Sequence, residues 1–165
     1  MSREYYIYPY RFNNKDSYLI WFSNEEDGVI VNENGIVPSF DNIKDLQVYS
    51  EENKISVDIE SSKLLNLDLI QKWLTEDKSE IEDYNNFLDA WNLFGDFSKS
   101  IDESFDADKK NTNKIYDEIF WGCNIPVVTP VGKSYKPIWT KKELKIIRKT
   151  LNFGFQMFTE RVREQ

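Results

Sequence analysis

The chain has 165 residues, a formal net charge of −8 and no histidine. Its length suits one domain with a substantial core, and its 5 Trp, 9 Tyr and 11 Phe exclude a disordered chain. No apolar run reaches the roughly 18 residues that a membrane span needs. The first residues lack a signal-peptide pattern, and a single cysteine suits a reducing compartment. We therefore expect a cytoplasmic protein.

The first sixty residues carry the signals of β-structure. Tyrosines alternate along residues 5–12, and the polar run 13–16 is typical of a turn. The dipeptide Asn34-Gly35 favours a hairpin, and apolar residues alternate along residues 54–59. These patterns predict an antiparallel meander of four to five strands.

Two helices are expected in the middle of the chain. Asn66 can cap a helix that runs to about Leu74. Ser79 and Glu82 have the spacing of a capping box for a helix that reaches about Ser100. The side chains expected to face inward are Leu69, Ile70, Trp73 and Leu74 in the first helix, and Ile81, Tyr84, Leu88, Trp91 and either Phe94 or Gly95 in the second.

Two more helices are expected near the C-terminus. Thr112 can cap a short helix that Gly122 ends. Thr140 and Glu143 form a second capping box for a helix that runs to about Val162. The three prolines between these helices predict a loop. The inward positions of the last helix are Leu144, Ile147, Leu151, Phe155 and Phe158, with Gly154 allowing a close approach.

The order of these elements indicates an α+β fold. Strands followed by helices do not suit a doubly wound parallel sheet, and no internal repeat or low-complexity linker divides the chain. We expect a single domain over residues 1–165. Its N-terminal antiparallel β-sheet (1–60) should pack against three to four C-terminal helices (61–165).

The absence of histidine excludes several kinds of active site. Only histidine titrates near neutral pH without perturbation, so Ser-His-Asp and Cys-His catalysis and histidine-ligated zinc are excluded. Cys123 follows a predicted helix C-terminus, where the helix dipole disfavours a thiolate. No phosphate-binding GxxxxGK[ST] or GxGxxG motif occurs. We predict no enzyme, no catalytic residue and no cofactor.

Carboxylates are the remaining candidates for chemistry. Asp106 and Asp108 fall at the first and third positions of a calcium-loop pattern, but Lys110 occupies the fifth and Asn111 replaces the glycine at the sixth. A lysine ammonium would repel the ion, so no metal site is predicted. Pairs of acids suited to glycoside hydrolysis are interpreted as solvated surface charges.

Charge is divided along the sequence. Residues 1–120 carry 12 Lys+Arg against 26 Asp+Glu, a net of −14, whereas residues 121–165 carry nine against three, a net of +6. Such an acidic body produces a negative field that speeds encounter with a cationic partner. The basic C-terminal helix is interpreted as packing against this body, which would itself repel the phosphates of a nucleic acid.

Acidic residues gather in two segments that we expect to be exposed. One is the turn after the second strand, and the other is the loop between the second and third helices. Aromatic neighbours of such acids would supply the packed anchors of an interface. The residues predicted to contact a partner are Glu25, Glu26, Asp27, Asp102, Glu103, Asp106 and Asp108.

Three aromatic segments resemble a bacterial family. Residues 91–97 (WNLFGDF), 116–122 (YDEIFWG) and 137–140 (PIWT) are similar to patterns in immunity proteins of contact-dependent growth inhibition and related polymorphic toxin systems. The resemblance covers roughly residues 84–150. It implies a cytoplasmic protein that binds a secreted toxin domain, often a nuclease, and blocks its active site.

The same segments also suit a structural role. Trp91, Phe94, Phe120, Trp121 and Trp139 are expected in the core, holding the helices to the sheet. The neighbouring polar residue Asn92 is expected to hydrogen-bond a loop backbone.

The sequence therefore favours an immunity protein that neutralises a basic, nuclease-like toxin domain. Neither nucleic acid nor membrane is an expected partner, and the free chain is expected to be a monomer or a weak homodimer. A phage-type acidic inhibitor that mimics DNA, a carboxylate-dependent enzyme, and a structural or assembly subunit remain alternatives.

Overall fold

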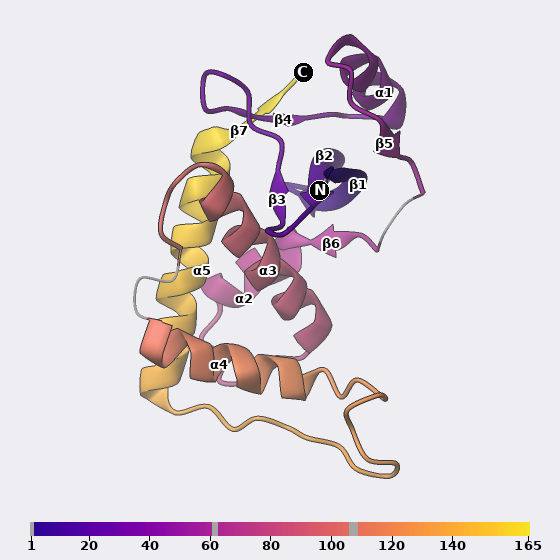
Figure 1. The fold of residues 1–165 in the computed structure, drawn as a ribbon. Helices are drawn as coiled ribbons and strands as arrows, with labels where there is room; N and C mark the ends of the chain where they lie inside the picture. Colours follow the sequence, from indigo (N-terminus) through magenta and orange to yellow (C-terminus); the bar gives the residue numbers. More distant parts are fainter. Residues whose placement is uncertain (1, 61–62, 106–108) are drawn as a thin grey trace.

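The computed structural model describes residues 2–60, 63–105 and 109–165. Within these ranges the chain has an α+β fold, as the order of sequence signals predicts (Figure 1). The elements are β1 (Glu4–Phe12), β2 (Lys15–Ser23), β3 (Gly28–Val29), β4 (Val37–Ser39), α1 (Ile43–Glu52), β5 (Val57–Asp58), β6 (Leu65–Asn66), α2 (Leu67–Thr75), α3 (Tyr84–Ser100), α4 (Lys109–Gly122), α5 (Lys141–Arg161) and β7 (Val162–Glu164).

The main sheet is built on one long hairpin. Strands β1 and β2 pair over their whole length, from Glu4 opposite Ser23 to Phe12 opposite Lys15. The turn residues Asn13 and Asn14 both have positive φ, 54° and 59°, as a two-residue turn that matches the twist of the strands requires. The predicted N-terminal hairpin is therefore confirmed.

The rest of the sheet differs from the predicted meander. Strand β3 pairs with β2 antiparallel, but β5 and β6 both pair with β1 in parallel, so the five-stranded sheet is mixed. The turn at Gly35, with φ of 74°, forms as predicted. The hairpin predicted around it is wrong, because β4 pairs with the C-terminal strand β7 and not with β3, while Phe40 after β4 makes one antiparallel bridge with Tyr18 of β2.

Two of the four predicted helix starts are confirmed. The Asn66 side chain caps α2, and Thr140 with Glu143 forms the capping box of α5. The predicted start at Ser79 is wrong, since α3 begins after Asp83, whose side chain accepts from the backbone N–H of Asn86.

Residues 79–82 are held outside the helix by tertiary contacts. Trp73 Nε1 donates to the Glu80 carbonyl at 2.8 Å, and Ile81 is buried. The predicted cap at Thr112 is also wrong, because α4 begins at Lys109 and Thr112 is buried inside that helix.

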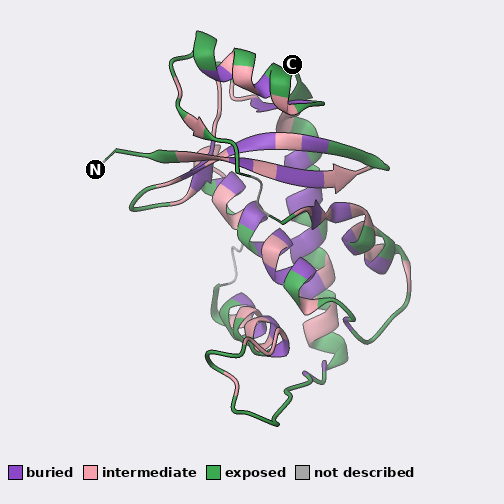
Figure 2. Cartoon of the chain, turned by 90° about the vertical axis from the view of Figure 1, so that its right-hand side faces the viewer, coloured by how far each residue is buried: buried purple, intermediate pink, exposed green. Residues whose placement is uncertain are grey.

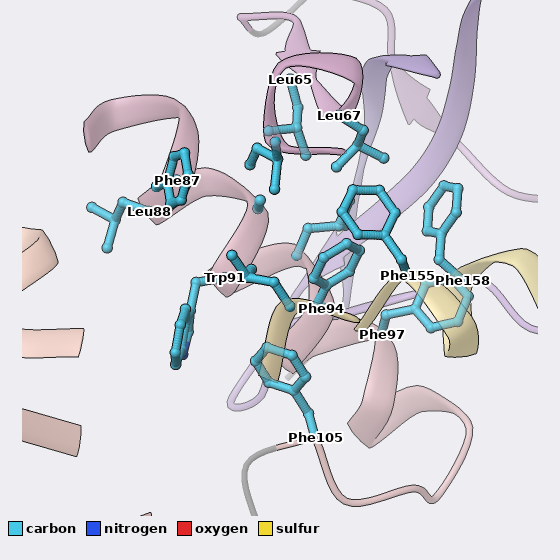
Figure 3. Close-up of a cluster of buried hydrophobic side chains, with 14 of the residues drawn as sticks. Leu65, Leu67, Phe87, Leu88, Trp91, Phe94, Phe97, Phe105, Phe155 and Phe158 are labelled. Carbon is cyan, nitrogen blue, oxygen red and sulfur yellow. The ribbon is translucent and has the colours of Figure 1, made fainter. Parts of the chain in front are cut away.

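Aromatic residues of α3 and α5 form the centre of the core (Figure 3). Phe94 lies 5.2 Å from Phe155 between ring centroids, and Phe97 lies 5.5 Å from Phe158. The hairpin joins this cluster through Tyr10, whose ring is 5.2 Å from that of Phe158. The sheet and the two helices thus share one apolar core.

Two side chains expected in the core are exposed. Leu69 on α2 is 48% exposed and Trp121 near the end of α4 is 47% exposed. Trp91, Phe94 and Trp139 are buried as predicted, while Phe120 is half-buried. Helical spacing identified an apolar face in each helix, but neighbouring elements cover only part of it.

None of the helices in the described ranges combines the length and the apolar character needed to cross a bilayer.

Gly154→Ala should destabilise the fold. A Cβ at residue 154 would lie 2.3 Å from Cδ2 of Phe94, and overpacking of this kind costs about 1–3 kcal/mol, so the urea midpoint should fall. Gly95→Ala is the matched control, because the nearest atom to its Cβ would be 4.0 Å away and alanine is the better helix former. Equal midpoints for Gly154→Ala and the wild type would contradict the close helix contact.

Candidate partner-binding surface

Helix α3 turns a polar stripe away from the core. Asp89, Asn92 and Asp96 are spaced three and four residues apart, so they share one face. Asn92 is exposed and both aspartates are half-buried, whereas Phe94 on the opposite face is fully buried. The burial of Phe94 therefore fixes which polar residues reach the surface.

Aromatic side chains border this stripe on both sides. Trp21 of β2 donates its Nε1 hydrogen to Oδ2 of Asp96 at 3.0 Å. From α4, the Tyr116 hydroxyl donates to Oδ1 of Asn92 at 2.9 Å, so Asn92 contacts a side chain and not the predicted loop backbone. The stripe lies between the hairpin and α4.

The folded protein disfavours the ionised forms of the two aspartates in the stripe. Burial raises the pKa of Asp96, with a further contribution from the negative charge of Asp27, although the Trp21 hydrogen bond opposes the shift. Burial also raises the pKa of Asp89. Tyr8 of β1 lies in the field of both, and burial together with these two charges raises the pKa of its hydroxyl well above the ordinary value. The charges of Lys63 and Lys99 oppose the shifts of Asp89 and Asp96, but they do not cancel them.

The structure brings the predicted acidic turn next to the same helix. The turn lies between β2 and β3, and the Val29 backbone N–H fixes it by donating to Oγ of Ser100 at 2.9 Å. An open groove of about 540 Å³ separates the turn from the end of α3, with Arg3 and Lys99 also in its lining. The predicted residues that line the groove are Glu25, Glu26 and Asp27.

The second predicted acidic segment is divided. Asp102 follows α3 and is exposed, with a φ of 57°. Glu103 is half-buried and accepts from Nη2 of Arg161 at 3.1 Å, while Arg161 also donates to the Gly35 carbonyl. Glu103 is therefore neutralised within the fold. The other two predicted residues, Asp106 and Asp108, lie outside the described residues.

We call five carboxylates on this side of the molecule the acidic face. Asp27 influences the pKa of Asp96, so the turn and the helical stripe adjoin. Among the described residues no lysine or arginine forms an ion pair with any of the five. The members are Glu25, Glu26, Asp27, Asp89 and Asp96.

Sequence reasoning missed the two helical members. Asp89 and Asp96 are seven residues apart in a helix whose apolar stripe was correctly identified. Their spacing was sufficient to place them on the outer face. The signal was overlooked because each acid is isolated in the sequence, whereas the predicted residues occur in runs.

Other chemical groups take part in structural contacts. The Cys123 thiol donates to the Ile119 carbonyl at 3.4 Å, and burial raises the pKa of that thiol, with the charge of Asp89 adding to the effect. Over residues 2–60, 63–105 and 109–165, no three histidine, cysteine, aspartate or glutamate side chains are arranged to hold a metal ion.

A pair of acids joins α4 to the start of α5. Burial raises the pKa of Glu118, and the adjacent Glu143 carboxylate adds to the shift. Burial alone would also raise the pKa of Glu143. The pKa of Glu143 is nevertheless lowered overall, because Thr140 donates hydrogen bonds to its carboxylate. Glu143 therefore belongs both to this acid pair and to the capping box of α5.

The basic C-terminal helix contacts the body mainly through two arginines. Arg148 stacks 4.2 Å from the Trp73 ring and donates to the carbonyls of Trp73 and Leu74 at the end of α2. Arg161 pairs with Glu103. The helix therefore packs on the body as predicted, but Arg148 contacts backbone carbonyls and not carboxylates. Four exposed lysines form no ion pair with the described residues: Lys141, Lys142, Lys145 and Lys149.

Comparison with known proteins gives a match at the level of fold. No family model matches the chain, and no curated protein sequence matches it. The chain is similar to a solved structure described as "The crystal structure of SatS c-terminal domain in complex with bromine". The TM-score is 0.60 at 10% identity, over 99% of this chain and 94% of that one. This similarity supports the α+β architecture and does not link the chain to immunity proteins.

Asp96→Asn should reduce the pH dependence of stability. Because the folded-state pKa of Asp96 is raised, its ionised form destabilises the fold at neutral pH, and this cost disappears as pH falls through the folded pKa toward the unfolded value. The variant should be at least as stable as the wild type at pH 7 and gain less stability between pH 7 and about pH 5. Thermal unfolding at several pH values measures both effects.

Asp102→Asn serves as the control for this experiment. It removes one exposed carboxylate close to the same helix end, and it should keep the pH profile of the wild type. If Asp96→Asn and the wild type have superimposable pH profiles, burial does not destabilise the ionised form of Asp96, and this explanation is wrong.

Proposed function

We propose that this chain is a non-enzymatic immunity protein that acts in the cytoplasm. In this proposal the acidic face binds a basic, nuclease-like toxin domain and covers its active site. The α+β fold supplies a rigid frame, because the face is built on α3 and on the end of the main hairpin.

One observation carries the proposal: among the described residues, the half-buried carboxylates of the acidic face form no ion pair, and the nearby charges of Lys63 and Lys99 only partly offset the effect of burial. Asp89 and Asp96 have pKa values raised by burial. A lysine or arginine from a partner would favour their ionised forms and relieve this cost. In the free protein, ionisation of these two half-buried carboxylates costs free energy. A cationic group that binds at the two positions would recover part of this cost.

The aromatic border adds specificity for such a partner. Trp21 and Tyr6 lie 5.8 Å apart between ring centroids, and Trp21 already contacts Asp96. Arginine and lysine side chains bind the faces of aromatic rings, and Trp and Tyr are common among residues that dominate binding energy. A combination of carboxylates and rings suits an arginine-rich surface better than an apolar one.

A nuclease is the toxin class that fits this chemistry. Proteins that bind nucleic acids carry lysine and arginine opposite the phosphates, so their active-site clefts are complementary to a negative protein surface. The similarity of residues 91–97, 116–122 and 137–140 to segments of immunity proteins supports the same class. Occlusion of the cleft would then need no chemistry by this chain.

Co-expression in a bacterium tests the proposal. The C-terminal domains of the large secreted proteins encoded in the same genome are expressed one at a time, with and without this chain, and growth is measured. At least one domain should be toxic alone and harmless in the presence of the chain. Asp89→Asn with Asp96→Asn should weaken the rescue, because the two carboxylates that attract the partner lose their charge.

Glu51→Gln with Glu52→Gln is the matched control. It removes the same charge from the exposed end of α1, which lies away from α3 in both views (Figures 1 and 2), and it should rescue growth like the wild type. With the purified pair, the association rate should fall about 10-fold between roughly 50 and 300 mM salt. No neutralised domain, or a rate indifferent to salt, would contradict the proposal.

A further inference from the structure

The connection between α4 and α5, residues 123–139, projects from the end of the molecule as an exposed segment that we call the arm (Figures 1 and 2). Both ends of the arm meet Tyr84 of α3. A Cβ on Gly122, just before the arm, would lie 2.6 Å from Cδ1 of Tyr84. Trp139, the last residue of the arm, donates its Nε1 hydrogen to the Tyr84 hydroxyl at 3.0 Å. The position of the arm therefore depends on how the end of α4 and the start of α5 are held together.

The acid pair lies at this junction. Glu118 is one turn before the end of α4, and Glu143 is in the first turn of α5. Their carboxyl groups are within hydrogen-bonding reach of each other. Oε2 of Glu118 is buried, yet it has no hydrogen-bond partner among the described residues. Such a buried oxygen is rare in folded proteins and needs a physical explanation.

A proton on one of the two acids removes this difficulty. Two ionised carboxylates are both acceptors, whereas a protonated carboxyl group donates one hydrogen bond. Glu143 suits the ionised form, because it accepts from the Thr140 backbone N–H at 3.0 Å and lies where the dipole of α5 favours negative charge. Glu118 lies near the C-terminus of α4, where the helix dipole opposes a carboxylate. The geometry therefore assigns the proton to Glu118.

Two lysines near the pair do not take the place of this proton. The charge of Lys114, one turn earlier in α4, favours the ionised forms of both acids. Within the described ranges, however, Lys114 and Lys142 form no ion pair with either acid. Both lysines line an open groove of about 220 Å³ together with Glu143. Solvent in this groove can exchange protons with the pair.

Two tyrosines also lie in the field of Glu118. They are Tyr84 of α3 and Tyr135 of the arm. Burial raises the pKa of both hydroxyls, and the charge of Glu118 adds to the effect. Both tyrosines therefore stay neutral in the pH range in which carboxyl groups titrate. Loss of the proton from Glu118 is thus the change of charge that the junction undergoes in that range.

We propose that the proton on Glu118 is a pH-sensitive switch for the arm. With the proton present, Glu118 donates to Glu143, and the end of α4 is held against the start of α5. As pH rises, the proton passes to water, and repulsion between two carboxylates loosens both ends of the arm. Because the folded protein favours protonated Glu118, the contact is strongest at low pH and weakens as pH rises through the folded pKa of that group. Neither acid belongs to the acidic face, so this switch does not depend on the proposed immunity function.

A carboxyl titration of the full chain tests where the proton lies. The Glu118 signal in a ¹³C NMR titration is assigned by its absence in Glu118→Gln. Its midpoint should lie above the value of an ordinary glutamate, about 4.3, and Glu143→Gln should lower it, because the neighbouring negative charge is gone. Glutamine at residue 143 keeps a side chain suited to the capping box. A wild-type midpoint at or below the ordinary value would overturn the proposal.

Amide hydrogen exchange tests the effect on the arm. The backbone N–H groups of Val128, Lys133 and Tyr135 are hydrogen-bonded within the arm. Once intrinsic exchange rates are divided out, their protection in the wild type should fall about tenfold between roughly pH 5 and pH 8. Glu118→Gln should keep its protection over the same range, since its amide N–H group donates to Glu143 at every pH.

Asp117→Asn is the matched control for the exchange experiment. It removes an exposed carboxylate from the neighbouring position of α4, so its arm should lose protection with rising pH as the wild type does. Asp89 and Asp96 titrate in all three proteins, and their contribution cancels in the comparison. If Glu118→Gln loses protection over the same pH range as the wild type, the proton does not hold the arm and the switch is wrong.

Discussion

The contact between Phe94 of α3 and Gly154 of α5 constrains the rest of the structure. Only glycine leaves room for the Phe94 ring at this point, since a Cβ at residue 154 would lie 2.3 Å from it. The rings of Phe155 and Phe158 surround the same ring. The contact of the Phe94 ring with the Gly154 backbone therefore fixes the rotation of α3 about its own axis. This rotation determines which residues of α3 meet solvent.

The acidic face is a consequence of this rotation. With Phe94 inward, Asp89 and Asp96 turn toward the hairpin and α4, where half-burial raises the pKa values of both carboxyl groups. Apolar side chains at these positions would avoid that electrostatic cost. Within the described part of the chain, these two carboxylates form no ion pair, so a cation from a partner would favour their ionised forms beside Tyr8 and Trp21.

The acidic face and the connection between α4 and α5, residues 123–139, have opposite chemical character. The acidic face consists of charged and aromatic groups on regular elements, whereas the arm presents aliphatic side chains and lysines on an irregular segment. Their separation would let one molecule contact two different partners, each by its own chemistry.

The sequence by itself determined the α+β class, the long hairpin, the ends of α3 and α4, and the caps at Asn66 and Thr140. These features depend on neighbours within about four residues, because turns, caps and periodic faces are local. Glu25, Glu26 and Asp27 were recognised as an acidic turn for the same reason.

Tertiary structure decided what local patterns could not. The Trp73–Glu80 hydrogen bond delays the start of α3 from Ser79 to Tyr84, and the pairing of β5 and β6 with β1 makes the sheet mixed. Packing also neutralised Glu103 with Arg161 and brought Asp96 beside Asp27. Each outcome joins residues far apart in the chain, and the balance of burial and charge between such residues exists only once the core has formed.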